Sequence, residues 1–439
     1  MSSSTALAKH DPLDGLEPHD VVAAWHVRRL DELSDAALVG LATRHLAVPR
    51  RDPADSFVLH APLELMARAA LLRHVGPATR KRARQRIIRL TASYDSSPAM
   101  TAPRSTGGTA DVAAASSALH AAVAAGDLEG IDRATATLAA GTSAGELVAA
   151  LADLVVGRLS AAGHGAIFLY HLPRLLAADP SAAAMARGLL RDIGRNPSWE
   201  LTWMDHRESS RTPTRDLAMR LLDVASPGPL DSNFIYPTMS LVERSGLAAE
   251  LLDAPTKGLP VPEARHDLLR VAAWSMLQDD PVHAPYGWSH ALTMPQGALG
   301  VAPSCAAPQR AVAVAATFVL GLRATLGSVV LDPTWHPERR DDLDPSTFLD
   351  AGPDGAAAAV WHTSDGELPG FVDRLVTHAA LHQDAHLAKY TLACIDATRD
   401  DPAAGRLFLA AAAFLGGWWR TRGDDDDLFT RVGNPSAQR

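Results

Sequence analysis

The stretch FVLHAPLELMARAALLRHVG, residues 57–76, repeats apolar residues at intervals of three and four and ends at a glycine. This spacing places the apolar side chains on one face of a helix, and glycine commonly follows the last helical turn. A second helix-like stretch, ATRKRARQRIIRLTASYD, follows directly. Alanine is abundant, while β-branched and aromatic residues are sparse, and this composition favours helices over sheets. The sequence therefore predicts an all-α fold.

The domain organisation is simple. No stretch shows the alternation of apolar and polar residues that is typical of a strand, and no regular internal repeat is visible. We predict a single many-helix catalytic domain over residues 18–422, with a helical-repeat-like array as an alternative. Residues 1–17 and 423–439 are polar, and the second segment contains the acidic run GDDDD. We expect both ends to be flexible.

Proline-rich connections are expected to interrupt the helices. Residues 196–262 contain eight prolines, and we expect irregular structure there and again at 332–368. Two long helices, at about 370–398 and 402–420, are predicted to close the fold.

Charge and cysteine content narrow the functional classes. The 439-residue chain has a formal net charge of −9, and its one basic cluster, at 80–89, has the pattern of a solvated helix face. Two cysteines make no disulfide framework, and no apolar run reaches the ~18 residues of a membrane span. The N-terminus lacks the apolar core of a signal peptide. We expect a cytoplasmic protein without nucleic-acid or membrane partners; a monomer and a homodimer both stay open.

Several of the 18 histidines lie in apolar, helix-like surroundings, where a buried imidazole needs a partner. His60 lies in the apolar stretch already quoted, and alone it would be interpreted as a core histidine. In GHGAIFLYHLPRLL, residues 163–176, His164 lies between two glycines that permit close backbone approach to a ligand, and a helix-capping loop is the alternative. His171 lies two helical turns later and competes with His164 as a candidate.

A third stretch, DDPVHAPYGWSHALTMPQGALG at 279–300, combines histidines with aromatic residues. His283 and His290 flank Tyr286 and Trp288, and prolines and glycines interrupt the helix on either side. Irregular backbone that carries histidine and aromatic side chains is typical of a site wall. An ordinary loop with aromatic anchors is the alternative.

The fourth stretch is THAALHQDAHLAKYTLACIDA, residues 377–397. His378, His382 and His386 are spaced by four and predict one helical stripe that Lys389 continues. Histidines four apart on a helix are a common way to bind a metal. Asp384 does not lie on this stripe, but two other aspartates lie nearer to it and could support the metal ligands. These are Asp373 and Asp396.

Lys389 is one of only four lysines in the chain. A protonated ammonium has no lone pair for a metal. Burial lowers the pKa of lysine, so a neutral amine, or an amine carboxylated by carbon dioxide, is physically accessible. The alternatives are a lysine that extends to solvent or one that pairs with Asp373 or Asp396.

In their order and spacing, FVLHAPLELMARAALLRHVG, GHGAIFLYHL, GWSHALTMPQGAL and HQDAHLAKYTLACIDA resemble the questin oxidase-like family, helical oxygenases of aromatic polyketide pathways. The resemblance implies a non-haem Fe(II) site, or a site for another divalent transition metal, with molecular oxygen as co-substrate. It implies NADPH as the reductant in some members, although no glycine-rich dinucleotide fingerprint is visible. The ligands that it implies are His60, His164, His290, His386 and a carboxylated Lys389.

This resemblance leads to an oxygenase hypothesis in which the metal centre inserts oxygen into, or cleaves, a C–C bond of an aromatic polyketide or a related quinone or phenol. His283 or His382 would act as the base that ionises a phenol. Four aromatic residues are candidates to stack on the flat substrate. They are Trp288, Tyr286, Trp203 and Tyr236. Two rivals stay open: a zinc-dependent or metal-free helical hydrolase or cyclase, and a non-enzymatic helical binding protein.

Overall fold

The computed structural model describes residues 11–50, 56–100, 111–205, 217–224, 234–257, 259–340, 344 and 346–422. Over these residues the chain is a single all-α domain, and two isolated β-bridges are the only extended pairings. The all-α prediction is therefore confirmed. The expected flexible segment 423–439 and the first ten residues of segment 1–17 lie outside the described residues. No helix among the described residues is long and apolar enough to cross a membrane.

The N-terminal half is built from nine α-helices within the described residues. They are α1 (Val21–Val27), α2 (Asp35–Leu46), α3 (Ser56–Leu72), α4 (Pro77–Asp95), α5 (Val112–Ala125), α6 (Leu128–Gly141), α7 (Ala144–Val155), α8 (Gly165–Leu176) and α9 (Ala186–Arg195). Local sequence explains their limits. Ser143 and Glu146 form a reciprocal capping box at the start of α7, and α5 ends at Gly126, whose φ of 67° is left-handed.

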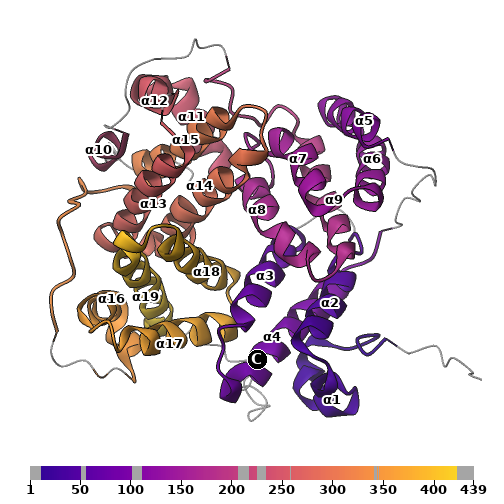
Figure 1. Cartoon of the computed structure of the whole chain (residues 1–439), viewed down its shortest axis with the longest axis horizontal. Helices are drawn as coiled ribbons and strands as arrows, with labels where there is room; N and C mark the ends of the chain where they lie inside the picture. Colours follow the sequence, from indigo (N-terminus) through magenta and orange to yellow (C-terminus); the bar gives the residue numbers. More distant parts are fainter. Residues whose placement is uncertain are drawn as a thin grey trace, which may run out of the picture.

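The C-terminal half adds ten α-helices over the described residues. They are α10 (Leu217–Leu222), α11 (Ile235–Arg244), α12 (Leu247–Lys257), α13 (Val261–Gln278), α14 (Ser289–Val301), α15 (Pro308–Leu326), α16 (Gly352–His362), α17 (Leu368–Leu381), α18 (Ala385–Asp400) and α19 (Gly405–Thr421). Figure 1 shows this half, in orange and yellow, beside the N-terminal half, in indigo and magenta.

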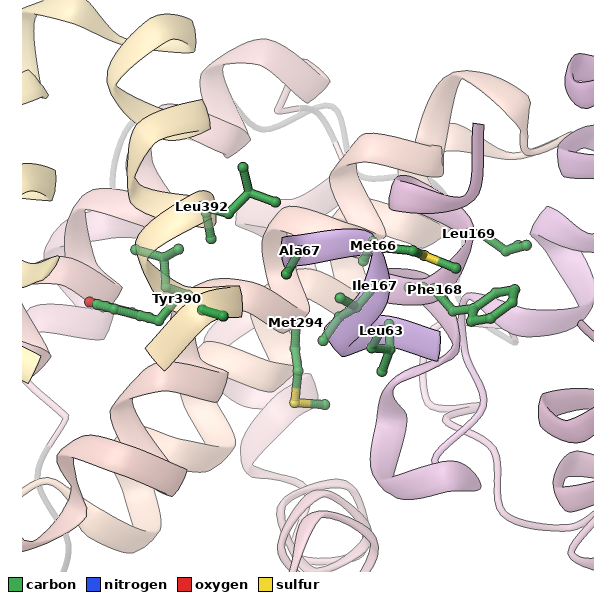
Figure 2. Packing of buried hydrophobic residues seen from close by; sticks show 14 of the residues in the cluster. Leu63, Met66, Ala67, Ile167, Phe168, Leu169, Met294, Tyr390 and Leu392 are labelled. Atoms are coloured by element: carbon green, nitrogen blue, oxygen red, sulfur yellow. The ribbon is translucent and has the colours of Figure 1, made fainter. Parts of the chain in front are cut away.

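The two halves meet through four helices. α3 packs against α8 and α18, and α14 packs against α8 and α18 as well. The four helices lie toward the middle of the molecule (Figure 1), and each contributes buried apolar side chains to the packing in Figure 2. α14 and α8 approach closely at Gly297, where a Cβ atom would lie 2.7 Å from the backbone nitrogen of Ile167. These four helices carry the candidate site.

Three parts of the predicted helix pattern are wrong. The region 196–262 contains α10, α11 and α12, and the region 332–368 contains α16. Prolines were interpreted as breaks, but Pro237 and Pro353 lie in the first turns of α11 and α16, where the missing N–H costs no hydrogen bond. The helix predicted at 370–398 is in fact two helices, α17 and α18, separated at His382–Asp384.

Candidate metal centre

Four helices bring four predicted histidines together. His60 comes from α3, His164 from the N-terminal end of α8, His290 from α14 and His386 from α18. One nitrogen each from His60, His164 and His386 lies within 4.8 Å of the others, and Nε2 of His290 lies 3.1 Å from Nε2 of His164. The ring centroids of His290 and His386 are 5.1 Å apart. The structure thus places side by side four residues that span more than 300 positions of the sequence.

His386 is oriented by the residue that starts its helix. Asp384 is the N-cap of α18: its Oδ1 accepts the backbone N–H of His386 at 2.6 Å. The same oxygen lies 3.2 Å from Nδ1 of the His386 ring. Burial alone would raise the pKa of Asp384, but the hydrogen bonds from His386 and the charges of His386 and His382 together outweigh it and lower that pKa to about 2. Asp384 is therefore the carboxylate behind this histidine, in place of the predicted Asp373 or Asp396.

His164 is oriented by strained backbone. Ala161, Ala162 and Gly163 have φ values of 51°, 49° and 70°, a left-handed run that is unfavourable for alanine. The carbonyl of Ala161 lies 2.9 Å from Nδ1 of His164. A Cβ atom at Gly163 would lie 2.4 Å from Cε of Met294 on α14. Gly163 was predicted to allow approach of a ligand, but in the structure it allows the turn and the approach of α14.

His290 follows an unusual helical turn. Residues Ala284–Trp288 form the π-helical turn η6, a type that is rare and frequently found at functional sites. The carbonyl of Tyr286 in this turn accepts a hydrogen bond from Nδ1 of His290. The third stretch of the sequence is thus continuous helix around His290, with the predicted irregularity confined to η6 and the 3₁₀ turn η5 (Pro281–His283).

These hydrogen bonds fix which ring nitrogens are free. A backbone carbonyl can only accept, so Nδ1 of His164 and of His290 must each carry the proton. In the neutral rings, Nε2 then has a lone pair, and the two Nε2 atoms face each other at 3.1 Å. Burial, together with nearby Lys389 and the other histidines, lowers the pKa of both rings well below 6.5, which disfavours a bridging proton. Two lone pairs at this distance suit a shared cation, because two imidazoles bound at about 2.1 Å and at right angles are about 3.0 Å apart.

Lys389 lies close enough to these histidines for its charge to lower the pKa of His164 and His290. Its side chain is only 4% exposed, and within the described part of the chain its Nζ has no hydrogen-bond partner. Burial lowers its pKa to about 8, although Asp384 and Glu64 oppose the shift. Asp396, predicted as an alternative partner, instead pairs with Arg174 at 2.5 Å. The structure therefore shows neither extension of Lys389 to solvent nor pairing with Asp396. The other predicted partner, Asp373, is exposed and lines a separate cleft.

Glu64 is a nearby carboxylate that we did not predict from the sequence. It lies one turn after His60 on α3 and pairs with Nε of the buried Arg68 at 2.6 Å. Arg68 also donates to the carbonyls of Ala380 and His382, at the C-terminal end of α17. The spacing of four between His60 and Glu64 was the available signal. Because Glu64 is engaged by Arg68, it is poorly placed to act as a general base.

Tyr286 is the one predicted aromatic residue that contacts the centre. Its ring lies edge-on to His386, with centroids 4.9 Å apart, and its hydroxyl lies 3.4 Å from Oδ2 of Asp384. Tyr286 is 55% exposed, and the side chain of His386 beside it is 15% exposed. Against His164, a separate cavity of about 40 Å³ has room for about three waters.

The other three aromatic candidates have structural roles. Trp288 is fully buried, and its Nε1 donates to the carbonyl of Asp280, so it cannot stack on a substrate. Trp203 donates to the hydroxyl of Thr317 at 3.0 Å. Tyr236 is stacked on Trp199, with centroids 3.9 Å apart. The periodicity of the sequence could not separate these core contacts from an exposed stacking surface.

The remaining histidine candidates have other neighbours. His171 packs beside Tyr170, and burial lowers its pKa to about 3. His283 contacts Trp288 edge-on, with centroids 6.4 Å apart. His382 ends α17, and burial together with His378 lowers its pKa to about 3. That pKa makes His382 a weak base, and its neighbours point to a different role.

The chain was compared with protein-family models, curated proteins and solved structures, and none of them matches it.

Proposed function

We propose that the chain is a non-haem iron oxygenase that inserts oxygen into, or cleaves, a C–C bond of an aromatic polyketide or a related phenol or quinone. The observation that supports this proposal is the pair of facing Nε2 lone pairs on His164 and His290, with His60 and His386 beside them. Neutral imidazoles suit iron and other divalent transition metals.

The five residues have distinct roles in this proposal. His60, His164, His290 and His386 hold the metal, and the oxygens on Nδ1 of the last three fix their orientation. Lys389, as the neutral amine, reacts with carbon dioxide: Nζ forms a bond to the carbon and releases a proton, which leaves an anionic carbamate oxygen. A metal bound by these residues would supply the one-electron chemistry that lets dioxygen react with an organic substrate.

The substrate is proposed to approach past Tyr286. A drug-sized ligand needs a pocket of about 300–1,000 Å³, so the 40 Å³ cavity beside His164 admits only molecules of the size of water or dioxygen. Tyr286 is exposed and lies against His386, so it offers an aromatic wall at the open side of the centre. This separates the entry of the small co-substrate from that of the aromatic substrate.

Oxygen consumption tests the proposal. Iron-loaded protein is offered a panel of hydroxylated anthraquinones and naphthols in an oxygen electrode, with and without NADPH. We expect substrate-dependent oxygen uptake that His386→Ala abolishes. The control His120→Ala changes an exposed histidine of α5 and should leave uptake intact. Turnover without oxygen uptake, or turnover that survives removal of the metal, would show a hydrolase or cyclase instead.

A further inference from the structure

A second cleft, of about 500 Å³, lies along α17. Its lining includes His382, Arg82 of α4, Arg374 of α17, Arg420 of α19 and Phe348 of the 3₁₀ turn η8 (Phe348–Ala351). None of the five candidate metal residues lines it. We call it the His382 cleft, and its volume is in the range of small-molecule sites.

His382 lines this cleft and carries a buried donor. The backbone N–H of Asp384 donates to Nδ1 of His382 at 3.0 Å, so Nδ1 carries the lone pair and Nε2 carries the proton. His382 is only 4% exposed, and its Nε2 has no hydrogen-bond partner among the described residues. A buried N–H without an acceptor is unfavourable, so it marks a place where a ligand atom could accept.

The charges around the cleft favour an anion. Three guanidiniums line it, from Arg82, Arg374 and Arg420, against two carboxylates. One of these, Asp350, pairs with Nε and Nη2 of Arg420 at 2.8 and 2.6 Å, which leaves Arg82 and Arg374 in excess over one carboxylate. The other, Asp373, is exposed. Guanidiniums match the planar geometry of carboxylate and phosphate oxygens, while Phe348 gives the cleft an apolar wall.

We propose that the His382 cleft binds the oxyanion of a small molecule, a carboxylate or a phosphate, with the Nε2–H of His382 as its buried donor. The oxyanion accepts from this N–H and lies within the guanidinium cluster, and the apolar part of the molecule packs on Phe348. The site is independent of the proposed oxygenase activity, because its lining contains no candidate metal ligand.

Anion binding to metal-free, full-length protein tests this site. Inorganic phosphate and benzoate are titrated separately by calorimetry, and the ring N–H of His382 is followed by ¹⁵N-edited NMR. We expect saturable binding of at least one of the two anions, with a shift of the His382 signal. Phosphate alone would identify a phosphate-bearing ligand, and benzoate alone a carboxylate-bearing one.

Three variants decide whether binding uses the proposed groups. His382→Phe should weaken binding at least about tenfold, as expected when a hydrogen bond to a charged group is lost. Arg374→Ala changes an exposed residue that should not affect folding, and we expect about threefold to tenfold weaker binding. Arg244→Ala, on the exposed face of α11, is the control and should bind as the unchanged protein does. No saturation of either anion by about 10 mM, or equal affinities in Arg374→Ala and the unchanged protein, would overturn the proposal.

Discussion

His382 and His386 lie four residues apart, and their rings have opposite hydrogen-bonding patterns. Nδ1 of His386 faces a carboxylate oxygen of Asp384, which leaves Nε2 as the lone-pair side of the neutral ring. Nδ1 of His382 instead accepts the backbone N–H of the same Asp384, so its Nε2 carries a proton. One aspartate thus leaves a lone pair on Nε2 of His386, the metal-ligand candidate, and a proton on Nε2 of His382, the proposed hydrogen-bond donor to an anion. The group on Nδ1, more than burial, decides what the other nitrogen can do.

The largest expected effect comes from removing that shared aspartate side chain. Asp384→Ala removes the oxygen that orients His386, and we expect metal affinity to fall by about 10- to 100-fold. It also removes the N-cap of α18, which costs about 1 kcal/mol of stability. The backbone N–H that faces His382 is unchanged, so anion binding in the His382 cleft should persist. Metal titration and anion calorimetry on the same preparation measure both effects.

Asp384→Asn is the matched control for this change. Its amide oxygen can still accept from His386, so its metal affinity should lie between those of the unchanged protein and Asp384→Ala. If Asp384→Ala binds metal as tightly as the unchanged protein, the orientation of His386 by this carboxylate is wrong.

A smaller effect is expected at His164, whose ring is oriented by backbone conformation and not by a side chain. Gly163→Ala adds a Cβ atom at a φ of 70° and 2.4 Å from Cε of Met294, next to His164. We expect a loss of about 1–3 kcal/mol in the free energy of unfolding, measured by urea denaturation. Gly188→Ala in α9, where a Cβ atom would meet nothing within 4 Å, should be neutral or slightly stabilising. Equal stabilities for the two variants would contradict the proposed strain at residues 161–163.

The smallest effect is expected at a histidine that has an aspartate beside each ring nitrogen. His45 lies between Asp95 on Nδ1 and Asp11 on Nε2, and the hydrogen bond to Asp95 is the main cause of its raised pKa. Because the folded pKa lies above the unfolded value, this stabilisation is fully present below pH 6.5 and is lost as pH rises through the folded pKa. We expect a decrease on the order of 1 kcal/mol between pH 6 and pH 9 that Asp95→Asn reduces, measured by urea unfolding across this range. An identical pH profile in Asp95→Asn would refute the assignment.

Much of the fold and of the centre could be predicted from the sequence for one physical reason. Helical periodicity identified the all-α class, and within it a histidine or lysine on an apolar stripe is conspicuous, because burial of such a group needs a partner. His60, His386 and Lys389 were singled out in this way, His164 by its flanking glycines and His290 by the aromatic residues around it. The set of five came only from what the family resemblance implies. The structure brings the four histidines together and buries Lys389 beside them.

The rest depended on features that the sequence shows weakly. Asp384 two residues before His386 is an N-cap signal, but the four-residue spacing of the histidines suggested one continuous helix instead. The left-handed Ala161 and Ala162 have no signal at all, since alanine seldom adopts that conformation. The burial of Trp288 depends on which helices pack around it, which no local pattern contains.

The most direct test of the central claim is to count metal and its ligands in protein purified without a histidine tag. After anaerobic loading with Fe(II), we expect about one equivalent of iron, with X-ray absorption showing several imidazole ligands, and a loss of binding in His164→Ala. Less than about 0.1 equivalent of iron, or iron bound equally well by His164→Ala, would contradict the assignment of the four histidines as a metal centre.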